Sequence, residues 1–570
     1  MPPAPSSSPW EASAVALSPI DIELVRTALG SVVDEMYVAL MKSAHSTNIK
    51  ERCDHSTALF DRRGRVVAQG ESLPLHLASM LGLVEVVLER HGRDGLGPGD
   101  MFISNDPFVG RGSHLPDVAM VMPVFHDGRL VLFVANIAHH ADIGGMVPGS
   151  VAGGMTEIFQ EGVRIPAIRI VKDGAVVEDV LDLICLNVRV PRERRGDYLA
   201  QIAVNRLGAR RLAELFARTP VAHVEEAADA LIEAVARRMR AGIAALPDGT
   251  YRFEDRVDDD GMGTRNIPVC VTITVDGEAI TLDFAGSGPQ CRGNINTSFA
   301  GLQASVLYAL KVLVDPDGPT NHGMVDPVTI HAPERSIVNA GFPAATAARA
   351  QTCQRVIDVI LGALAPAVGD RAVAASNGAN TTTTFSGVGP DGTYYVYMET
   401  IGGGAGARAT RDGVDGVQVH ITNTSNLPIE ALEREYPILI ECYALEPDTG
   451  GAGTWRGGLA LRRDYRALGH VTTFSAQGER FDSAPWGLSG GGPGGRGRHH
   501  LRFDDGRVED LPAKPIPRDV PPDAVVSVVT PGAGGFGPPE GRAPEDRAAD
   551  LADGKVSPAF LSRWYPDPQP

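Results

Sequence analysis

Four residues that could form a metal or acid–base site stand at the two ends of one predicted β-hairpin. His114 and Asp117 precede the apolar run VAMVMPVF, and His139 and His140 follow the apolar run LVLFVANIA. Between the two runs, the sequence His126-Asp127-Gly128-Arg129 is typical of a tight hairpin turn. Because the far ends of a hairpin lie side by side, we expect imidazole and carboxylate groups to gather there.

Two neutral imidazoles and a carboxylate suit a catalytic divalent cation that keeps coordination positions open for water or substrate. Zn²⁺, Mn²⁺ and Fe²⁺ all fit this ligand set. The alternative is that the histidines only cap strand ends through hydrogen bonds. A His-x-x-Asp motif and a His-His pair at the same hairpin end favour the metal site.

The orientation of the Asp117 side chain depends on where the pairing of the two strands stops. With a turn centred on Asp127-Gly128, His139 is predicted to face Pro116. Alternation of side chains along a strand would then place His114 and His139 on one face and Asp117 on the other. Because proline cannot donate to the ladder, we expect pairing to stop at Pro116 and Asp117 to turn inward.

The elements around the hairpin predict an α+β fold. Ser18 and Pro19 predict the start of an amphipathic helix that ends near Ala44, and residues 192–245 are also predicted to be helical. A second strand–turn–strand unit spans 53–70. Beyond Pro247-Asp248-Gly249 come strands, two helical stretches near 299–313 and 353–366, and glycine-rich, β-like sequence.

These patterns divide the chain into four predicted parts. Buried hairpins with flanking helices form the first half, and the second half is rich in strands and glycine turns. The predicted parts are a flexible tail at 1–17, a metal-site region at 18–246, a β-rich region at 247–537 and an extension at 538–570.

Composition and charge argue against several classes of function. The net charge of −18 disfavours nucleic acid or an anionic membrane as partner. Six scattered cysteines without a CxxC pair argue against a zinc ribbon or a disulfide scaffold. Residues 1–17 lack the pattern of a signal peptide, and no run approaches the roughly 20 apolar residues of a membrane span. We therefore expect a cytoplasmic protein.

No nucleotide-binding motif fits its required context. The glycine patterns at 402–407 and 490–495 are not followed by a helix-like segment, which the dinucleotide fingerprint requires. A Walker A motif is absent from the sequence. We therefore expect no phosphate-binding loop for ATP in this chain.

Three segments around the hairpin resemble signature segments of the hydantoinase B/oxoprolinase family: NDPFVGRGSHLPD, NIAHHADIGGMVPGS and TEIFQEGVRIPA. The resemblance covers almost the whole chain and continues through 196–206, 315–324, 401–408, 448–458 and 485–495. That family includes B subunits of ATP-dependent hydantoinases and lactamases, the matching part of 5-oxoprolinases, and metal-bearing subunits of acetone carboxylases.

The resemblance implies a set of site residues. His114, Asp117 and His139 resemble the family's metal ligands. Asp54, in RCDHSTALFD, resembles an acidic residue at the same site, which is either a further ligand or the base that activates water. For the transfer of the proton, either Asp54 or the neighbouring His140 is the predicted catalytic residue, and His140 is proposed from its position next to His139.

The resemblance also implies a metal-dependent amidohydrolase subunit that opens a hydantoin, 5-oxoproline or another lactam. ATP would be bound by a separate A subunit, an actin/sugar-kinase-like ATPase, in a hetero-oligomer. Two alternatives stay open. One is the metal-bearing subunit of an ATP-dependent ketone carboxylase. The other is a non-catalytic scaffold for the ATPase partner, which predicts no metal.

Overall fold

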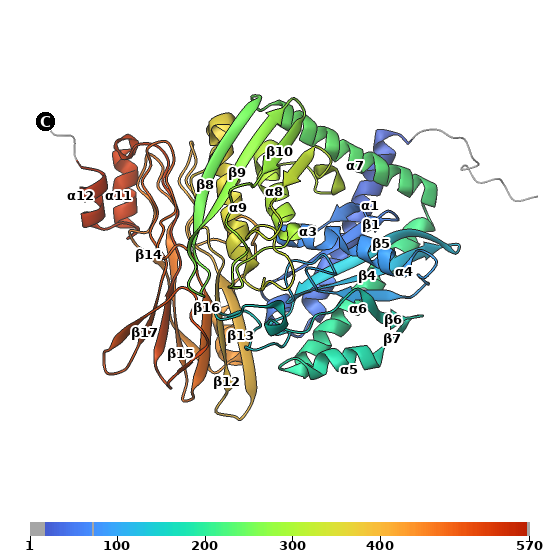
Figure 1. Cartoon of the computed structure of the whole chain (residues 1–570), viewed down its shortest axis with the longest axis horizontal. Helices are drawn as coiled ribbons and strands as arrows, with labels where there is room; N and C mark the ends of the chain where they lie inside the picture. Colours follow the sequence, from blue (N-terminus) through green and yellow to red (C-terminus); the bar gives the residue numbers. More distant parts are fainter. Residues whose placement is uncertain (1–16, 71–72, 567–570) are drawn as a thin grey trace, which may run out of the picture.

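The computed structural model describes residues 17–70 and 73–566, so nearly all of the predicted tail at 1–17 lies outside the described residues. The prediction of an α+β fold is confirmed, since helices and strands of several separate sheets alternate along the chain (Figure 1). The predicted boundary at 247 falls between helix α7 and strand β8.

A seven-stranded antiparallel sheet forms the centre of the first half. Its strands, in spatial order, are β2 (Val66–Gln69), β1 (His55–Asp61), β5 (Arg129–His139), β4 (Asp117–His126), β3 (Met101–Ser104), β6 (Ile168–Lys172) and β7 (Ala175–Val176). The strands β4 and β5 are buried along most of their length, as their apolar sequences predict.

Helices cover both faces of this sheet. On one face lie α1 (Pro19–Ser43) and α6 (Pro191–Phe216), with α7 (Val221–Ala244) packed against α1. On the other face lie α3 (Pro74–Leu81) and α4 (Leu83–His91), which were not predicted from the sequence. The start of α1 is fixed as expected, because Ser18 and Asp21 form a reciprocal capping box.

The register of the β4–β5 hairpin differs by one residue from the prediction. Asp127 and Gly128 form the turn with φ angles of 49° and 75°, as a two-residue hairpin turn requires. Val131 then has no partner on β4, because Val124 pairs with Leu132 while the next residue pairs with Leu130. This β-bulge shifts the remaining pairs by one residue and moves each later side chain of β5 to the opposite face.

The second half contains three further sheets. The first has the order β11 (Val328–His331), β10 (Ala279–Asp283), β9 (Arg265–Asp276) and β8 (Gly249–Asp259). The second has β13 (Tyr394–Ile401), β12 (Thr381–Val388), β16 (Thr472–Gln477) and β19 (Arg518–Val520). The third has β14 (Ile438–Glu446), β15 (Ala460–Ala467), β20 (Val525–Val529), β17 (Arg498–Arg502) and β18 (Val508–Leu511).

The last two sheets pack face to face and share one aromatic core. Phe385 of β12 contacts Tyr465 of β15 with ring centroids 4.7 Å apart, and it contacts Phe474 of β16 at 5.1 Å. The remaining short helices are α2 (Thr47–Lys50), α5 (Glu178–Leu186), α10 (Ile429–Glu435), α11 (Pro544–Ala552) and α12 (Pro558–Trp564). The helices α11 and α12 lie at the outer end of this sandwich (Figure 1), where Arg542 pairs with Asp412 and Asp550.

The helices α8 (Phe299–Val314) and α9 (Arg349–Val368) pack against each other close to the predicted positions. Among the described residues, the stretch Arg349–Arg371 has the length and composition to span a membrane, with a mean hydropathy of 1.2, although no such run was expected from the sequence. Of its apolar part, 78% is buried inside the protein. A helix surrounded by protein is apolar on all sides for the same physical reason, so α9 is a core helix.

Candidate metal centre

Three neighbouring strand ends place acidic and imidazole groups in one row across the seven-stranded sheet. His139 ends β5 and pairs with Asp117, the first residue of β4. On its other side, the backbone N–H of His139 donates to the carbonyl oxygen of Asp54, which directly precedes β1, at 2.9 Å. Residues directly opposite each other in a sheet project to the same face. Asp54, His139 and Asp117 therefore share one face, and the predicted break at Pro116 is not needed.

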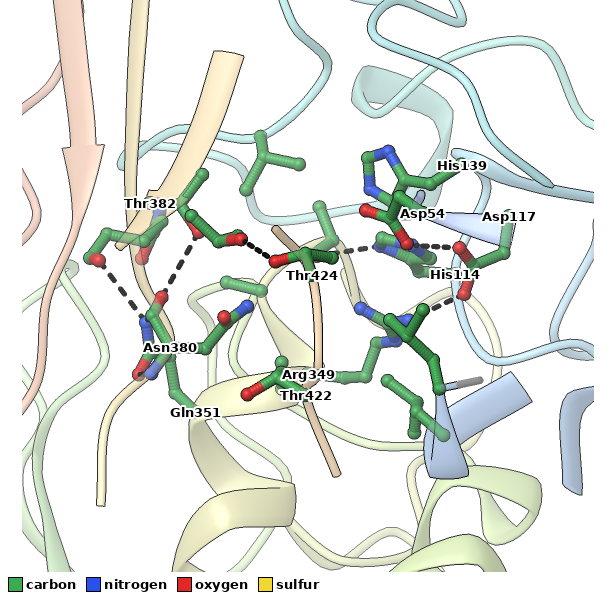
Figure 2. A pocket seen from close by; sticks show the side chains of 18 of the residues that line it. Asp54, His114, Asp117, His139, Arg349, Gln351, Asn380, Thr382, Thr422 and Thr424 are labelled. Carbon is green, nitrogen blue, oxygen red and sulfur yellow. Dashed lines mark hydrogen bonds and ion pairs between the residues drawn. The ribbon is translucent and has the colours of Figure 1, made fainter. Parts of the chain in front are cut away.

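His114 joins this row from the loop that precedes β4. Its Nδ1–H donates to the carbonyl oxygen of Ala347 at 2.9 Å, which turns Nε2 toward Asp117. One ligand atom each from His114, Asp117 and His139 lies within 4.8 Å of the others, and all three residues are buried (Figure 2). The structure thus brings together the three residues predicted from the hairpin.

The chemistry of this trio fits a bound cation. Nε2 of His114 lies 3.2 Å from Oδ1 of Asp117, and neither atom has a hydrogen-bond partner within the described part of the chain. Burial, reinforced by Arg349, lowers the pKa of His114. Burial alone would raise the pKa of Asp117, but His114, Arg349 and His76 hold it well below 3.8. Because Nδ1 of His114 carries the hydrogen given to Ala347, the neutral form of His114 presents the lone pair of Nε2 to the Asp117 carboxylate, and a divalent cation would satisfy both.

Asp117 is oriented by two donors behind it. Its Oδ2 accepts from Nη2 of Arg349 at 2.6 Å and from Oγ of Ser113 at 3.0 Å, and Nε of Arg349 donates to the same Ser113 oxygen at 3.1 Å. Arg349 is the first residue of α9. Because Oδ2 is occupied in this way, Oδ1 is left for the cluster, as is usual for carboxylates whose second oxygen is held by outer partners.

Glu161 positions the segment that orients His114. Its Oε1 accepts from the backbone N–H groups of Thr346 and Ala347, both at 2.7 Å. The side chain is fully buried, and burial raises its pKa from 4.5 to about 8. Glu161 does not line the pocket described below. It acts on the cluster through Ala347, whose carbonyl oxygen holds His114.

Asp54 lies beside the trio but outside the tight three-residue group. Its Oδ1 lies 3.7 Å from Nε2 of His76, and the same nitrogen lies 3.5 Å from Oδ1 of Asp117. Nδ1 of His76 is 2.9 Å from Oγ of Ser56. Neither His76 nor Arg349 was predicted from the sequence. His76 stands alone in an apolar stretch, Arg349 follows a run of small residues, and neither carries a spacing signal, so only the packing of α3 and α9 brings them here.

His140 lies on the other face of the sheet, and the prediction that it is catalytic loses its geometric basis. Its ring stacks on Tyr198 of α6 at 4.3 Å, and its Nε2 lies 3.0 Å from Oε1 of Gln201. It does not line the pocket that contains the trio. Adjacent residues of a strand project to opposite faces, so His139 and His140 cannot both reach the same site.

A pocket opens directly against the trio. It encloses about 560 Å³ of empty space, part of it open to solvent. Figure 2 shows Asp54, His114, Asp117 and His139 on one side of it and Gln351, Asn380 and Thr382 on the other. The sheet of the first half supplies the ligand-like residues, while α9, β12 and β16 of the second half supply the opposite wall.

The fold and the buried trio define a candidate metal-dependent enzyme centre at the junction of two halves. The family model for hydantoinase B/oxoprolinase matches residues 18–539, so the chain belongs to this family. The family resemblance seen in the signature segments is thereby confirmed.

Named relatives and solved structures agree with this membership. A Pseudomonas sp. protein described as the putative B-type subunit of a D-/L-hydantoinase is 32% identical, over 95% of this chain and 93% of the relative. The chain is 35% identical to 5-oxoprolinase 1 of Arabidopsis thaliana, covering 89% of this chain but only 41% of that protein. An ATP-dependent caprolactamase from Pseudomonas jessenii has a similar structure (TM-score 0.90, 28% identity, 97% of this chain and 96% of that chain). An acetone carboxylase shares the fold (TM-score 0.90, 19% identity, 96% and 79% coverage).

We expect the purified protein to bind a divalent cation, and we expect the affinity for that cation to depend on His139 but not on His140. His114→Ala and His139→Ala should each weaken binding by more than about 100-fold, because ligand loss exceeds the 10–100-fold effect of losing an outer partner. His140→Ala is the matched control, since it removes the neighbouring imidazole from the wrong face. Metal content by elemental analysis checks this. Equal losses in the His139 and His140 variants would contradict the assignment.

We expect Arg349→Met to weaken metal binding by about 10-fold or more, because Asp117 would lose one of its two donors and the other donor, Ser113, would lose the hydrogen bond from Arg349. Competition with a chromophoric chelator measures the affinity. Tighter binding in the variant would show instead that the positive charge of Arg349 opposes the cation more than its hydrogen bonds help.

The raised pKa of Glu161 predicts a specific pH dependence of stability. Between its ordinary pKa of 4.5 and its folded pKa of about 8, the folded protein keeps a proton that the unfolded chain has lost. This carboxyl group therefore costs stability increasingly as pH rises through that window. Glu161→Gln keeps the acceptor oxygen but cannot ionise. The difference between the thermal midpoint of this variant and that of the wild type should shift in favour of the variant as the pH rises from 5 to 8. A difference that does not change with pH would refute the raised pKa of Glu161.

Proposed function

We propose that this chain is the metal-bearing subunit of an ATP-dependent enzyme that hydrolyses a cyclic amide, with ATP bound by a separate ATPase subunit. The observation that carries the proposal is the arrangement of two buried atoms without a hydrogen-bond partner among the described residues, Nε2 of His114 and Oδ1 of Asp117. They lie 3.2 Å apart beside a pocket. Membership of the family and the names of its relatives support the reaction class.

The residues divide the work of hydrolysis between them. A divalent cation held by His114, Asp117 and His139, with Zn, Mn or Fe as candidates, would supply a Lewis acid and an ionisable water. Asp54 lines the same pocket and stands next to His139 in the sheet. It either completes the ligand set or accepts the proton of the attacking water. Arg349 keeps Asp117 in its productive orientation.

ATP chemistry is assigned to a partner. A stable amide needs activation, and the sequence has no Walker A motif. The chain spans only about two-fifths of the Arabidopsis 5-oxoprolinase, and its Pseudomonas relative is named as one subunit of an enzyme. We assign activation to an A-type, actin/sugar-kinase-like ATPase in a cytoplasmic hetero-oligomer. A phosphorylated enol or imidate-type intermediate would then pass to the pocket described here.

We expect the complex of this chain with its A-type ATPase to release phosphate when a cyclic amide is added and to open the ring. His139→Ala should abolish ring opening, because it removes a ligand, whereas His140→Ala should retain it. Chromatographic detection of the opened product together with phosphate release measures both steps.

Two outcomes would overturn the proposal in favour of the alternatives. Bicarbonate-dependent consumption of a ketone, with no ring opening, would identify a carboxylase subunit. Full activity in a His114→Ala, His139→Ala double variant would identify a non-catalytic scaffold.

A further inference from the structure

The wall of the pocket opposite the metal cluster is uncharged. It is built from carboxamide and hydroxyl side chains: Gln351, Asn380, Thr382, Thr400, Thr422, Thr424 and Gln477. Among the described residues that line the pocket, Arg349 is the only lysine or arginine, and it is bound to Asp117. Figure 2 shows the charged groups and the amide groups on opposite sides. On the wall opposite the metal cluster, the described lining residues therefore include no lysine or arginine, and Arg52 lies behind that wall, bound to the hydroxyl of Thr400.

Gln351 fixes the backbone of the two carboxamide residues in this wall. Its Nε2 donates to the carbonyl oxygens of Asn380 and Gln477 at 2.8 and 3.3 Å, and its Oε1 accepts from the N–H of Asn380 at 3.0 Å. Both ends of the Gln351 side chain are thus used within the protein. Its role is to hold Asn380, just before β12, and Gln477, the last residue of β16, beside each other.

The side chain of Gln477 presents a bare acceptor. Asn294 donates its Nδ2 to the carbonyl oxygen of Ala152 at 2.8 Å, so its Oδ1 is an acceptor. Gln477 must turn its Nε2 toward that oxygen, 3.5 Å away, which leaves its own Oε1 free. Gln477 is only 1% exposed, and Oε1 has no partner within the described part of the chain. A buried acceptor without a partner is costly, and an N–H donor of a ligand would satisfy it.

Asn380 and Thr424 complete the pattern of donors and acceptors. Oδ1 of Asn380 is likewise buried and without a partner among the described residues. Arg52 donates to Oγ1 of Thr400 at 2.7 Å, and Thr400 lies 2.7 Å from Oγ1 of Thr424. Because arginine can only donate, Thr400 accepts from it, and the hydrogen between the two threonine oxygens can belong to either of them. When Thr400 supplies that hydrogen, the hydroxyl of Thr424 can donate its own to a ligand.

We propose that the ring opened at this site is uncharged and carries a second amide or ureide group beside the scissile amide. Its N–H groups donate to the side-chain oxygens Oδ1 of Asn380 and Oε1 of Gln477. Its carbonyl oxygen accepts a hydrogen bond from the hydroxyl of Thr424. A carboxylate at this position would face two bare oxygen acceptors and no cation, so the pocket selects against anionic rings. This inference rests on the proposed function and narrows it to one substrate class.

The binding of cyclic amides to the metal-loaded protein tests whether the pocket selects neutral ureide rings over anionic rings. The probes are hydantoin, which is a neutral ureide ring, 2-pyrrolidinone, which is a neutral ring with a single amide, and 5-oxoproline, which carries a carboxylate. Calorimetry should show hydantoin binding at least about 10-fold more tightly than either of the others, since each hydrogen bond satisfied at a buried acceptor is worth roughly one factor of ten. Hydantoin binding that is absent, or no tighter than that of 5-oxoproline, would overturn the proposal.

Gln477→Met tests the residue assignment. It keeps the volume of the side chain but removes the acceptor, so hydantoin should bind about 10-fold more weakly while 2-pyrrolidinone is unaffected. Gln69→Met is the matched control, because Oε1 of Gln69 is also buried without a partner among the described residues, yet Gln69 does not line the pocket. Unchanged binding of 2-pyrrolidinone shows that the variants are folded. Equal losses of hydantoin binding in both variants would refute the role of Gln477.

The two proposals fail in distinguishable ways. If the complex with its ATPase opens 5-oxoproline and the protein does not prefer hydantoin, the inference on substrate class is wrong and the proposed function stands. If no cyclic amide of any charge is opened, the proposed function itself is wrong.

Discussion

The facing lone pairs of His114 and Asp117 are the constraint on which the rest of the site depends. Two buried acceptor atoms at 3.2 Å repel each other, so the fold must hold them in place, and a bound cation would relieve that repulsion. Each is fixed from behind, His114 by the carbonyl oxygen of Ala347 and Asp117 by Arg349. Both supports come from the few residues before and at the start of α9, and Glu161 clamps that segment.

Because those supports belong to the second half of the chain, the site exists only where the two halves meet. The first half supplies the row formed by Asp54, His139 and Asp117, and the second half supplies Arg349 and the uncharged wall. Further buried charge pairs join the same elements: Arg355 of α9 pairs with Asp255 of β8 and with Glu479, which follows β16. Removing one partner from such pairs is costly, so they hold α9 in register with the wall of the pocket.

Predictions from local pattern succeeded where a short stretch of sequence carries its own physical signal. The capping box at Ser18, the Asp-Gly turn and the apolar strands β4 and β5 were all predicted, as was the gathering of His114, Asp117 and His139 at the far end of the hairpin. The prediction failed on the pairing register, since the bulge at Val131 depends on packing against both faces and has no local signal. That bulge aligns Asp117 with His139, a role that was assigned to Pro116 on the basis of sequence.

The sequence by itself determined which residues could bind a cation and that one hairpin would bring them close, because turn chemistry and side-chain alternation act over short distances. The tertiary structure decided which of the adjacent histidines faces the pocket, since the face of a side chain depends on register. It also decided that His76, Arg349, Asn380 and Gln477 belong to the site. They come from separate elements, and only the packing of α3, α9, β12 and β16 against the central sheet gives them a common location.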